Sequence, residues 1–167
     1  MPVRRLNHAV LYVRELDRSV AFYTDVLGFS VETEIPARAA FLRAEDTQND
    51  HDLGLFAVGG QAPGPEHGRV GLYHLAWEVG TLGELADTAA RLRAADALVG
   101  ASDHLVSKSL YAKDPDGNEF EVMWRVPRED WPGPEEGGGR VLPLDLDAAL
   151  RRWGPDLVTG AAAGSAT

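Results

Sequence analysis

Hydrophobic and polar residues follow the same succession of patterns twice along the chain. Residues 6–23 read LNHAVLYVRELDRSVAFY, and residues 72–89 read LYHLAWEVGTLGELADTA. A constant offset of 66 residues aligns Leu6 with Leu72, His8 with His74, and Val13 with Val79. A repeat of this length indicates two copies of one supersecondary unit, each too small to bury a core by itself.

Each copy begins with a pattern that predicts a strand followed by an amphipathic helix. In the first copy the apolar positions are Val20, Tyr23, Val26 and Leu27, with Asp17 as the predicted N-cap and Gly28 as the predicted stop. In the second copy the apolar stripe consists of Leu82, Leu85, Ala89 and Leu92. Thr81 and Glu84 form a capping-box pattern just before that stripe.

Short alternating segments after each helix predict strands, and the segment QAPGPEHGR over 61–69 predicts a linker. The strands are expected at about 29–35, 38–44 and 52–58, and then at 97–100, 107–113 and 118–125. The predicted fold class is therefore α+β, with two paired βαβββ modules at about 4–60 and 70–126. Together they form a single domain over 1–127, with a curved mixed sheet around a shared site.

Residues 128–167 form a C-terminal extension of different composition. The segment 131–140 reads as a loop, 144–153 as a short helix, and the last residues, GAAAGSAT, as a disordered tail. The sequence assigns no chemistry to this extension.

Two histidines and one glutamate are the candidate metal ligands. His8 and His74 occupy equivalent points of the two first strands, so paired modules can bring their imidazoles to one point. Glu121 lies inside the otherwise apolar strand EFEVMW, where a carboxylate needs a partner such as a cation. Two imidazoles and one carboxylate with open positions suit Fe(II), and Mn, Ni, Co or Zn remain alternatives.

The segment SLYAKDPDGNEFEVMW over 109–124 predicts a hairpin around the turn Asp114–Gly117. If the turn centres on Asp116, Tyr111 faces Glu121 on the same side of the hairpin. Superposing 121–126 on 53–58 places Leu53 at the position of Glu121, which leaves a site with three ligands. A register shifted by two residues would instead bring His51 inward as a fourth ligand; otherwise His51 reads as a polar loop residue.

These residues resemble the vicinal oxygen chelate superfamily, which includes glyoxalases, fosfomycin resistance proteins and extradiol dioxygenases. The resemblance covers about residues 4–127 and is carried by LNHAVLYVRELDRSVAFYTDVLGF, GLYHLAWEV and SDHLVSKSLYAKDPDGNEFEVMW. The last block is most similar to one-domain catechol 2,3-dioxygenase relatives. The resemblance implies iron bound by His8, His74 and Glu121, a substrate hydrogen bond from Tyr111, and proton transfer assisted by His104.

The chain also departs from the larger dioxygenases. It has two modules where they usually have four, and the spacing from His104 to Tyr111 differs from theirs. Another active-site histidine of those enzymes has no clear equivalent. Leu53 counts against a glyoxalase I site, which uses a second carboxylate at that corner.

Three functions follow from the resemblance. The first is a non-haem Fe(II) dioxygenase, an oxidoreductase that cleaves an aromatic diol. The second is another metal-dependent enzyme of the same fold, such as a glyoxalase-like isomerase or lyase or an antibiotic-modifying transferase. The third is a metal-free drug-binding protein, which the polar trio disfavours. Homodimers are usual in the resembled family, so a homodimer is expected.

The amino-acid composition limits the binding partners and the cellular compartment that we expect. The 26 acidic and 16 basic residues give a formal net charge of -10, which disfavours nucleic-acid binding and docking on anionic lipid. Cysteine is absent, which excludes disulfides and thiolate ligands and suggests a cytoplasmic protein. The N-terminal apolar run is expected to be a strand and not a signal peptide, and no stretch approaches the ~20 apolar residues of a membrane span.

Overall fold

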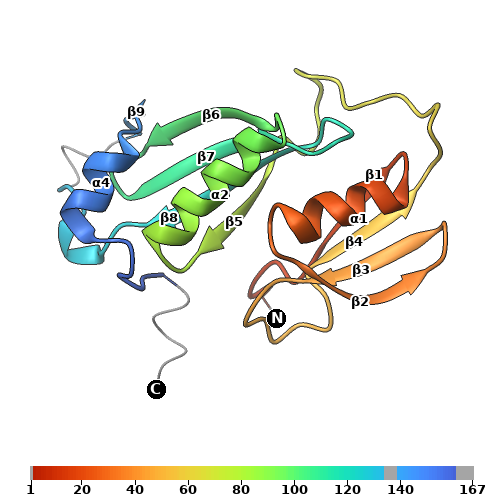
Figure 1. Ribbon diagram of the computed structural model, residues 1–167, viewed down its shortest axis with the longest axis horizontal. Helices are drawn as coiled ribbons and strands as arrows, with labels where there is room; N and C mark the ends of the chain where they lie inside the picture. The colour runs from red at the N-terminus through yellow and green to blue at the C-terminus, as the bar shows by residue number, and fades with distance from the viewer. Residues whose placement is uncertain (1, 134–138, 161–167) are drawn as a thin grey trace. The chain divides into compact units, whose positions relative to one another are not determined.

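The computed structural model describes residues 2–133 and 139–160 and divides the chain into two compact units. Unit 1 comprises Met1–His67 together with the turn Asp114–Gly117. Unit 2 comprises Gly68–Lys113 and Asn118–Thr167. Each unit contains one copy of the repeat, and each is described by itself below (Figure 1).

Unit 1 is a four-stranded sheet covered on one face by one helix (Figure 1). Its elements are β1 (Ala9–Val13), α1 (Leu16–Asp25), β2 (Ser30–Ile35), β3 (Ala39–Arg43) and β4 (Leu53–Ala57). The strand order is β1-β4-β3-β2, in which β1 runs parallel to β4 and the other pairs are antiparallel. Leu42, Leu53 and Leu55 are fully buried and form the centre of this core with Tyr23.

Unit 2 repeats that arrangement and extends it by one strand. Its elements are β5 (Leu75–Val79), α2 (Leu82–Ala94), β6 (Leu98–Asp103), β7 (Ser107–Lys113), β8 (Glu119–Arg125), the 3-10 helix η1 (Arg128–Asp130), β9 (Leu142–Pro143) and α4 (Leu146–Trp153). The strand order is β5-β8-β7-β6-β9, with β5 parallel to β8. Both units thus have the predicted βαβββ order, which confirms the α+β fold class.

The capping box of the second helix is confirmed, whereas the N-cap of the first helix is not where the sequence predicts it. The hydroxyl of Thr81 accepts from Glu84 N, and the Glu84 carboxylate accepts from Thr81 N. In unit 1 the helix starts at Leu16, and Glu15 is the N-cap, without a side-chain hydrogen bond. Asp17 lies in the first turn instead, where its charge still favours the positive end of the helix dipole.

Alternation along the strands separates a buried helix-facing side from the opposite side, here called the open face of each unit. On β8, Phe120, Val122 and Trp124 are buried against the helix layer, so Glu121 and Met123 point to the open face. On β4, Leu53 and Leu55 face the helix layer, so Gly54 and Phe56 lie on the open face.

The strand ladders correct the predicted equivalence of Leu53 and Glu121. In unit 1, Val10 pairs with Gly54. In unit 2, Ala76, which the 66-residue offset equates with Val10, pairs with Glu121. Gly54 is therefore the counterpart of Glu121. The superposition of 121–126 on 53–58 is therefore wrong by one residue. The loops differ in length between the two copies, so the offset between equivalent residues is not the same in the first and last strands.

The turn Asp114–Gly117 is held in unit 1 although the strands that it joins belong to unit 2. The Asp116 carboxylate accepts hydrogen bonds from Arg14 N at 2.8 Å, Arg14 Nη1 at 3.1 Å and Arg18 Nη2 at 2.6 Å. Asp114 accepts from the hydroxyl of Tyr23 at 3.2 Å. Gly117 adopts a φ of 92°, the left-handed conformation for which the turn requires glycine.

The C-terminal extension packs on unit 2. Strand β9 pairs with β6, and the Trp153 ring of α4 lies 5.5 Å from the Trp124 ring. The predicted helix over 144–153 corresponds to α4. Part of the predicted loop, 134–138, and most of the predicted tail, 161–167, lie outside the described residues.

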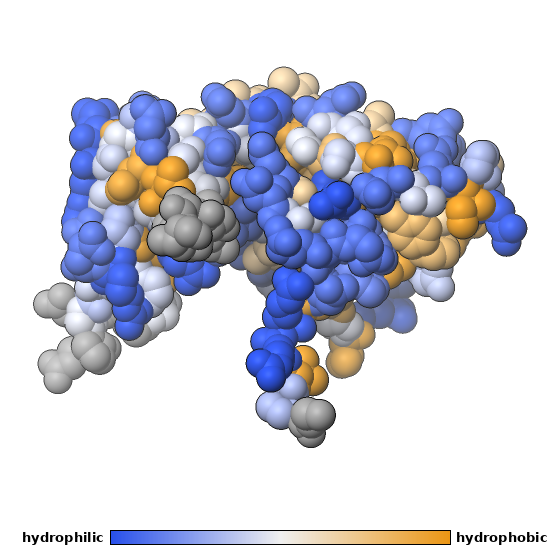
Figure 2. Space-filling view, turned by 90° about the horizontal axis from the view of Figure 1, so that it is seen from below, coloured by the Kyte–Doolittle hydropathy of each residue, from blue (hydrophilic) through white to orange (hydrophobic). Residues whose placement is uncertain are grey.

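Hydrophilic residues cover most of the face drawn in Figure 2, with smaller apolar areas between them. Among the described residues, no helix combines the length and apolarity needed to cross a membrane.

Candidate metal centre

His74 and Glu121 meet on the open face of unit 2. His74 directly precedes β5, and the parallel ladder between β5 and β8 brings Glu121 opposite Ala76. His74 Nε2 lies 3.3 Å from Glu121 Oε2, and the side chains are 24% and 13% exposed. The other ring nitrogen, His74 Nδ1, is buried and has no hydrogen-bond partner among the described residues.

The separation of these two atoms fits two ligands of one metal ion. Imidazole nitrogens and carboxylate oxygens bind divalent transition metals at about 2.1 Å. When the ligand–metal–ligand angle is a right angle or a little wider, the two ligand atoms lie roughly 3.0–3.4 Å apart. An imidazole that turns one nitrogen toward a carboxylate within a mostly apolar sheet is thus well placed to share a cation with it.

Tyr111 and His104 lie beside this pair. Tyr111 pairs with Glu121 across the β7–β8 ladder, so the predicted register of the hairpin is confirmed. Its ring centroid lies 5.9 Å from that of His74. His104 Nε2 lies 2.8 Å from the Tyr111 hydroxyl oxygen, within hydrogen-bond distance.

The surroundings of Tyr111 keep its phenol protonated. Burial raises the pKa of Tyr111 above its ordinary value, and the charge of the nearby Glu121 carboxylate raises this pKa further. A hydrogen bond with Ser109 acts in the opposite direction and is the smaller influence on the pKa. At neutral pH the group is therefore a hydroxyl that can donate a hydrogen bond.

His8 lies in unit 1, immediately before β1. Its side chain is exposed, and its Nδ1 is 2.8 Å from Asn7 Oδ1. Asn7 in turn donates to Asn49 Oδ1, which also accepts from Arg5. This amide network at the start of β1 fixes the segment that carries the imidazole.

His51 lies against His8, and the sequence placed it in the site only through an alternative register. The ring centroids of His8 and His51 are 4.5 Å apart, and His51 is 5.1 Å from the Phe41 ring. A hydrogen bond from His51 lowers the pKa of the Asp50 carboxyl. A sequence feature could have predicted this contact: His51 shortly precedes β4, which pairs with the strand that follows His8.

Gly54 stands at the corner of unit 1 that Glu121 occupies in unit 2. A Cβ added there would lie 3.4 Å from Val10 Cγ2 and 3.7 Å from two carbons of the Phe41 ring. The open face of unit 1 is therefore apolar at this position, and no carboxylate faces His8 from it.

Within each unit taken by itself, the described residues gather no group of three His, Cys, Asp or Glu side chains that could hold a metal ion. Unit 2 brings together two of the three candidate ligands, His74 and Glu121, along with Tyr111 and His104. The third candidate, His8, lies in unit 1 with His51.

Comparison with known proteins identifies the family and the fold. The family described as "Glyoxalase/Bleomycin resistance protein/Dioxygenase superfamily" matches residues 5–122. A catechol-2,3-dioxygenase of Bacillus subtilis is 35% identical over 160 residues, which cover 92% of this chain and 54% of that protein. A biphenyl-2,3-diol 1,2-dioxygenase of Rhodococcus globerulus is 39% identical over 122 residues, which cover 71% of this chain and 62% of that protein.

Solved structures show the same fold. A lactoylglutathione lyase from Agrobacterium tumefaciens has a TM-score of 0.55 and 27% identity, covering 74% of this chain and 96% of that chain. A glyoxalase/dioxygenase from Nostoc punctiforme has a TM-score of 0.60 and 21% identity, covering 74% of this chain and 92% of that chain. The chain spans only about half of the Bacillus dioxygenase. The match over residues 5–122 nevertheless takes in both copies of the repeat, and the chain belongs to the glyoxalase/bleomycin resistance protein/dioxygenase superfamily.

Proposed function

We propose that this protein is an extradiol dioxygenase that cleaves a catechol-type aromatic diol with Fe(II) held by His8, His74 and Glu121. One observation carries the proposal: on one face of unit 2, the His74–Glu121 pair at 3.3 Å lies beside the Tyr111–His104 pair at 2.8 Å. The first pair supplies metal ligands and the second supplies groups that hold and move a proton. The names of the curated relatives support the same reaction class.

The donor set suits the metal. Two imidazoles and one carboxylate leave coordination positions open, the arrangement typical of non-haem iron enzymes that use dioxygen. When bound, Fe(II) would act as a Lewis acid and a template that brings the diol and dioxygen together. The same ligands accept Mn, Ni, Co or Zn, so the identity of the metal is the first quantity to measure.

Tyr111 is the residue that would orient the diol. Its hydroxyl retains its proton, because burial raises its pKa, and it would donate a hydrogen bond to one oxygen of the substrate. His104 Nε2, at 2.8 Å from that hydroxyl, can accept a proton from it or return one. The two side chains together would move a proton without recruiting bulk water.

Within unit 1, His51 would contribute a second imidazole beside the proposed ligand His8. Its ring packs against His8 at 4.5 Å and against Phe41 at 5.1 Å, so it lies beside a proposed ligand and an aromatic surface. This position suits an acid or base near the metal. Phe41 and Phe56, whose rings are 5.9 Å apart, would provide an apolar surface for an aromatic substrate.

In the overall reaction, the bond between a hydroxylated ring carbon and its non-hydroxylated neighbour breaks. Both atoms of dioxygen enter the ring-opened product, so no external reductant is needed. The ring-opened product is yellow, which gives a direct optical assay.

The test is anaerobic purification followed by metal analysis, oxygen uptake and absorbance measurements with catechol and 2,3-dihydroxybiphenyl. About one iron per chain, with equal consumption of oxygen and diol, is the expected result. Bound metal without oxygen uptake across a panel of diols would assign the chain to another metal-dependent activity of the superfamily. A protein that binds no metal under these conditions would contradict the proposal and favour a binding protein.

A further inference from the structure

The loop that carries His104 contains a strained backbone conformation that is held by hydrogen bonds to neighbouring residues. Leu105 has a φ of 68°, a left-handed conformation that is unfavourable for a residue with a branched side chain. Leu105 N donates to Asp103 Oδ1 at 2.7 Å, and His104 N donates to Ser107 O at 3.0 Å. The position of His104 therefore depends on where the Asp103 carboxylate is held.

Asp103 is held by a buried cation. Lys108 Nζ lies 2.5 Å from Asp103 Oδ1, and only 5% of the Lys108 side chain is exposed. A buried ammonium group needs its partner, because removal of one member leaves an uncompensated charge. The same carboxylate oxygen thus joins the strained Leu105 amide to Lys108.

The C-terminal extension covers this cation. Lys108 Nζ lies 5.2 Å from the centre of the Trp153 ring, within the range of a cation–π interaction. Trp153 itself is fixed, since its ring packs on Trp124 and its Nε1 donates to Asp130 Oδ2 at 2.6 Å. Helix α4 therefore places an aromatic face on Lys108 and separates the ammonium group from water.

The extension reaches the same segment a second time through β9. The β6–β9 ladder pairs Ser102 with Pro143 and Asp103 with Leu142, directly before His104. Both β9 and α4 lie beyond residue 122, where the match to the superfamily ends. Two separate parts of the extension thus converge on the segment 102–108.

We infer that Trp153 is a positioning residue for His104, acting through Lys108 and Asp103, and that the C-terminal extension is a functional part of the site. This inference rests on the proposed function for its catalytic consequence. Its structural part, that Trp153 orders the loop 103–107, can be tested without any activity.

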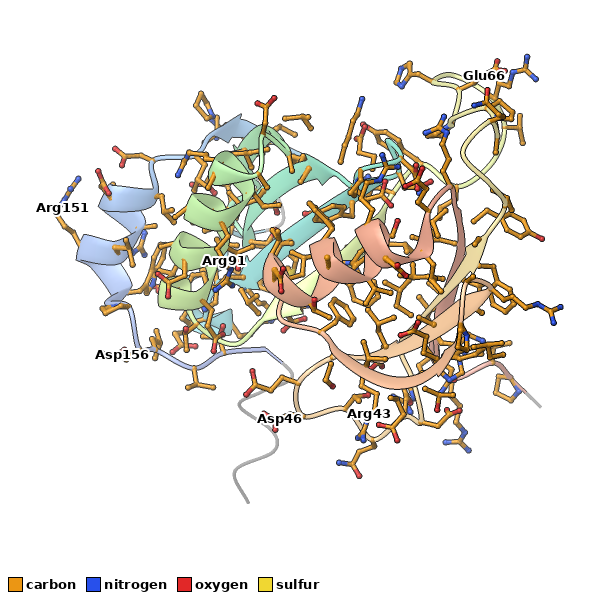
Figure 3. All side chains as sticks on the ribbon, turned by 45° about the vertical axis from the view of Figure 1, so that its right-hand side comes forward. Arg43, Asp46, Glu66, Arg91, Arg151 and Asp156 are labelled. Carbon is orange, nitrogen blue, oxygen red and sulfur yellow. The ribbon has the colours of Figure 1, made fainter. Side chains whose placement is uncertain are left out.

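The experiment compares three variants. Trp153→Leu removes the aromatic face but keeps apolar volume, and Trp153→Phe restores an aromatic face without the bond to Asp130. Arg151→Ala is the control, because this exposed residue of the same helix projects away from the unit (Figure 3). The two readouts are amide hydrogen exchange of Leu105 in metal-free protein, and kcat and KM for the diol in iron-loaded protein.

We expect Leu105 to exchange roughly tenfold faster in Trp153→Leu and at the native rate in the other two variants. In the same variant kcat should fall roughly tenfold with KM and iron content unchanged, less than the ~100-fold cost of a fully misplaced catalytic group. In a double-mutant cycle with Lys108→Met, the two substitutions should not be additive, because they act through one contact.

Unchanged exchange at Leu105 in Trp153→Leu would overturn the inference, whatever the activity. Loss of iron together with kcat would also overturn it, because the residue would then support the whole unit and not the loop. If the native protein cleaves no diol, the proposed function fails, and the exchange experiment still decides whether Trp153 orders the loop.

Discussion

The two units have the same order of elements and matching strand ladders, yet their open faces carry different chemistry. The 66-residue offset equates His8 with His74, and the ladders equate Phe41 with Tyr111, Gly54 with Glu121, and Ala39 with Ser109. At the last three positions unit 1 carries an apolar group or none, and unit 2 carries a hydroxyl or a carboxylate. Only the imidazole is kept in both.

This difference suggests a division of labour on one backbone design. Under the proposed function, unit 2 would supply the carboxylate ligand and the proton-moving pair, and unit 1 would supply one imidazole and an aromatic surface. Gly54 is informative here: a carboxylate at that corner would add charge beside Phe41 and Val10, which would make this apolar face less suited to the aromatic substrate of the proposed function. The extension widens the contrast, because it packs on unit 2 and holds the loop of His104.

The largest effects are expected when a proposed metal ligand is removed. The imidazole occurs in both units, and the carboxylate ligand occurs only in unit 2. His8→Ala, His74→Ala and Glu121→Gln should each reduce bound iron to a small fraction of one per chain. Under the proposed function, ring cleavage should fall by about 1000-fold or more, because the metal would supply the main catalytic effect. Metal analysis and oxygen uptake measure both effects.

Glu119→Gln is the matched control for these ligand variants, since Glu119 lies on the same strand and the same face, two residues from Glu121. It should retain iron and activity. A Glu121→Gln protein that keeps its full iron content would remove Glu121 from the ligand set.

A more selective change makes unit 2 resemble unit 1 at one atom. Tyr111→Phe gives unit 2 the side chain that Phe41 provides in unit 1. We expect iron binding to persist and kcat to fall about 100-fold, the usual contribution of a positioned proton donor. Steady-state kinetics on iron-loaded protein would show this. Tyr12→Phe, at a tyrosine that is 74% exposed, should change neither quantity.

Much of this contrast could be predicted from the sequence, because it depends on local patterns. The repeat gave both histidines equivalent positions, and the turn around Asp116 gave the correct pairing of Tyr111 with Glu121. The counterpart of Glu121 was predicted one residue too early, at Leu53 instead of Gly54, because no local pattern specifies the lengths of the loops between distant strands. His51 was predicted in the site only through an alternative register, and Trp153 was assigned no role, for a related reason: their contacts with His8 and Lys108 join segments far apart along the chain.

Unit 1 contains a buried carboxylate, that of Asp116, whose contribution to stability can be tested by substitution. Its side chain is 5% exposed and accepts hydrogen bonds from Arg14, Arg18 and the backbone. Asp116→Ala should lower the free energy of unfolding by about 2–3 kcal/mol, because it removes the carboxylate that accepts from both guanidinium groups. Arg18 is 46% exposed, so solvent screens its ion pair with Asp116, and the expected loss of stability is smaller than for a fully buried pair.

Chemical denaturation measures that change. Glu32→Ala is its control, since the pair of Glu32 with Arg43 is exposed on both sides and should contribute little. Equal destabilisation by Asp116→Ala and Glu32→Ala would show that the turn 114–117 is not a fixed part of unit 1.

The smallest expected effect concerns the extension, which has no counterpart in unit 1. The hydrogen bond from Trp153, and then the charge of Arg152, lower the pKa of Asp130 below its ordinary value. A carboxyl with a lowered pKa in the folded state stabilises the protein above its unfolded-state pKa, near 3.9. That stabilisation is lost as the pH falls through the lower folded-state pKa. Melting temperatures of the native protein and of Asp130→Asn should therefore differ by about 1 °C at pH 7 and converge at acid pH. A difference that grows as the pH falls would mean that Asp130 is not held by these partners, and it would remove one of the contacts that fix Trp153 over Lys108.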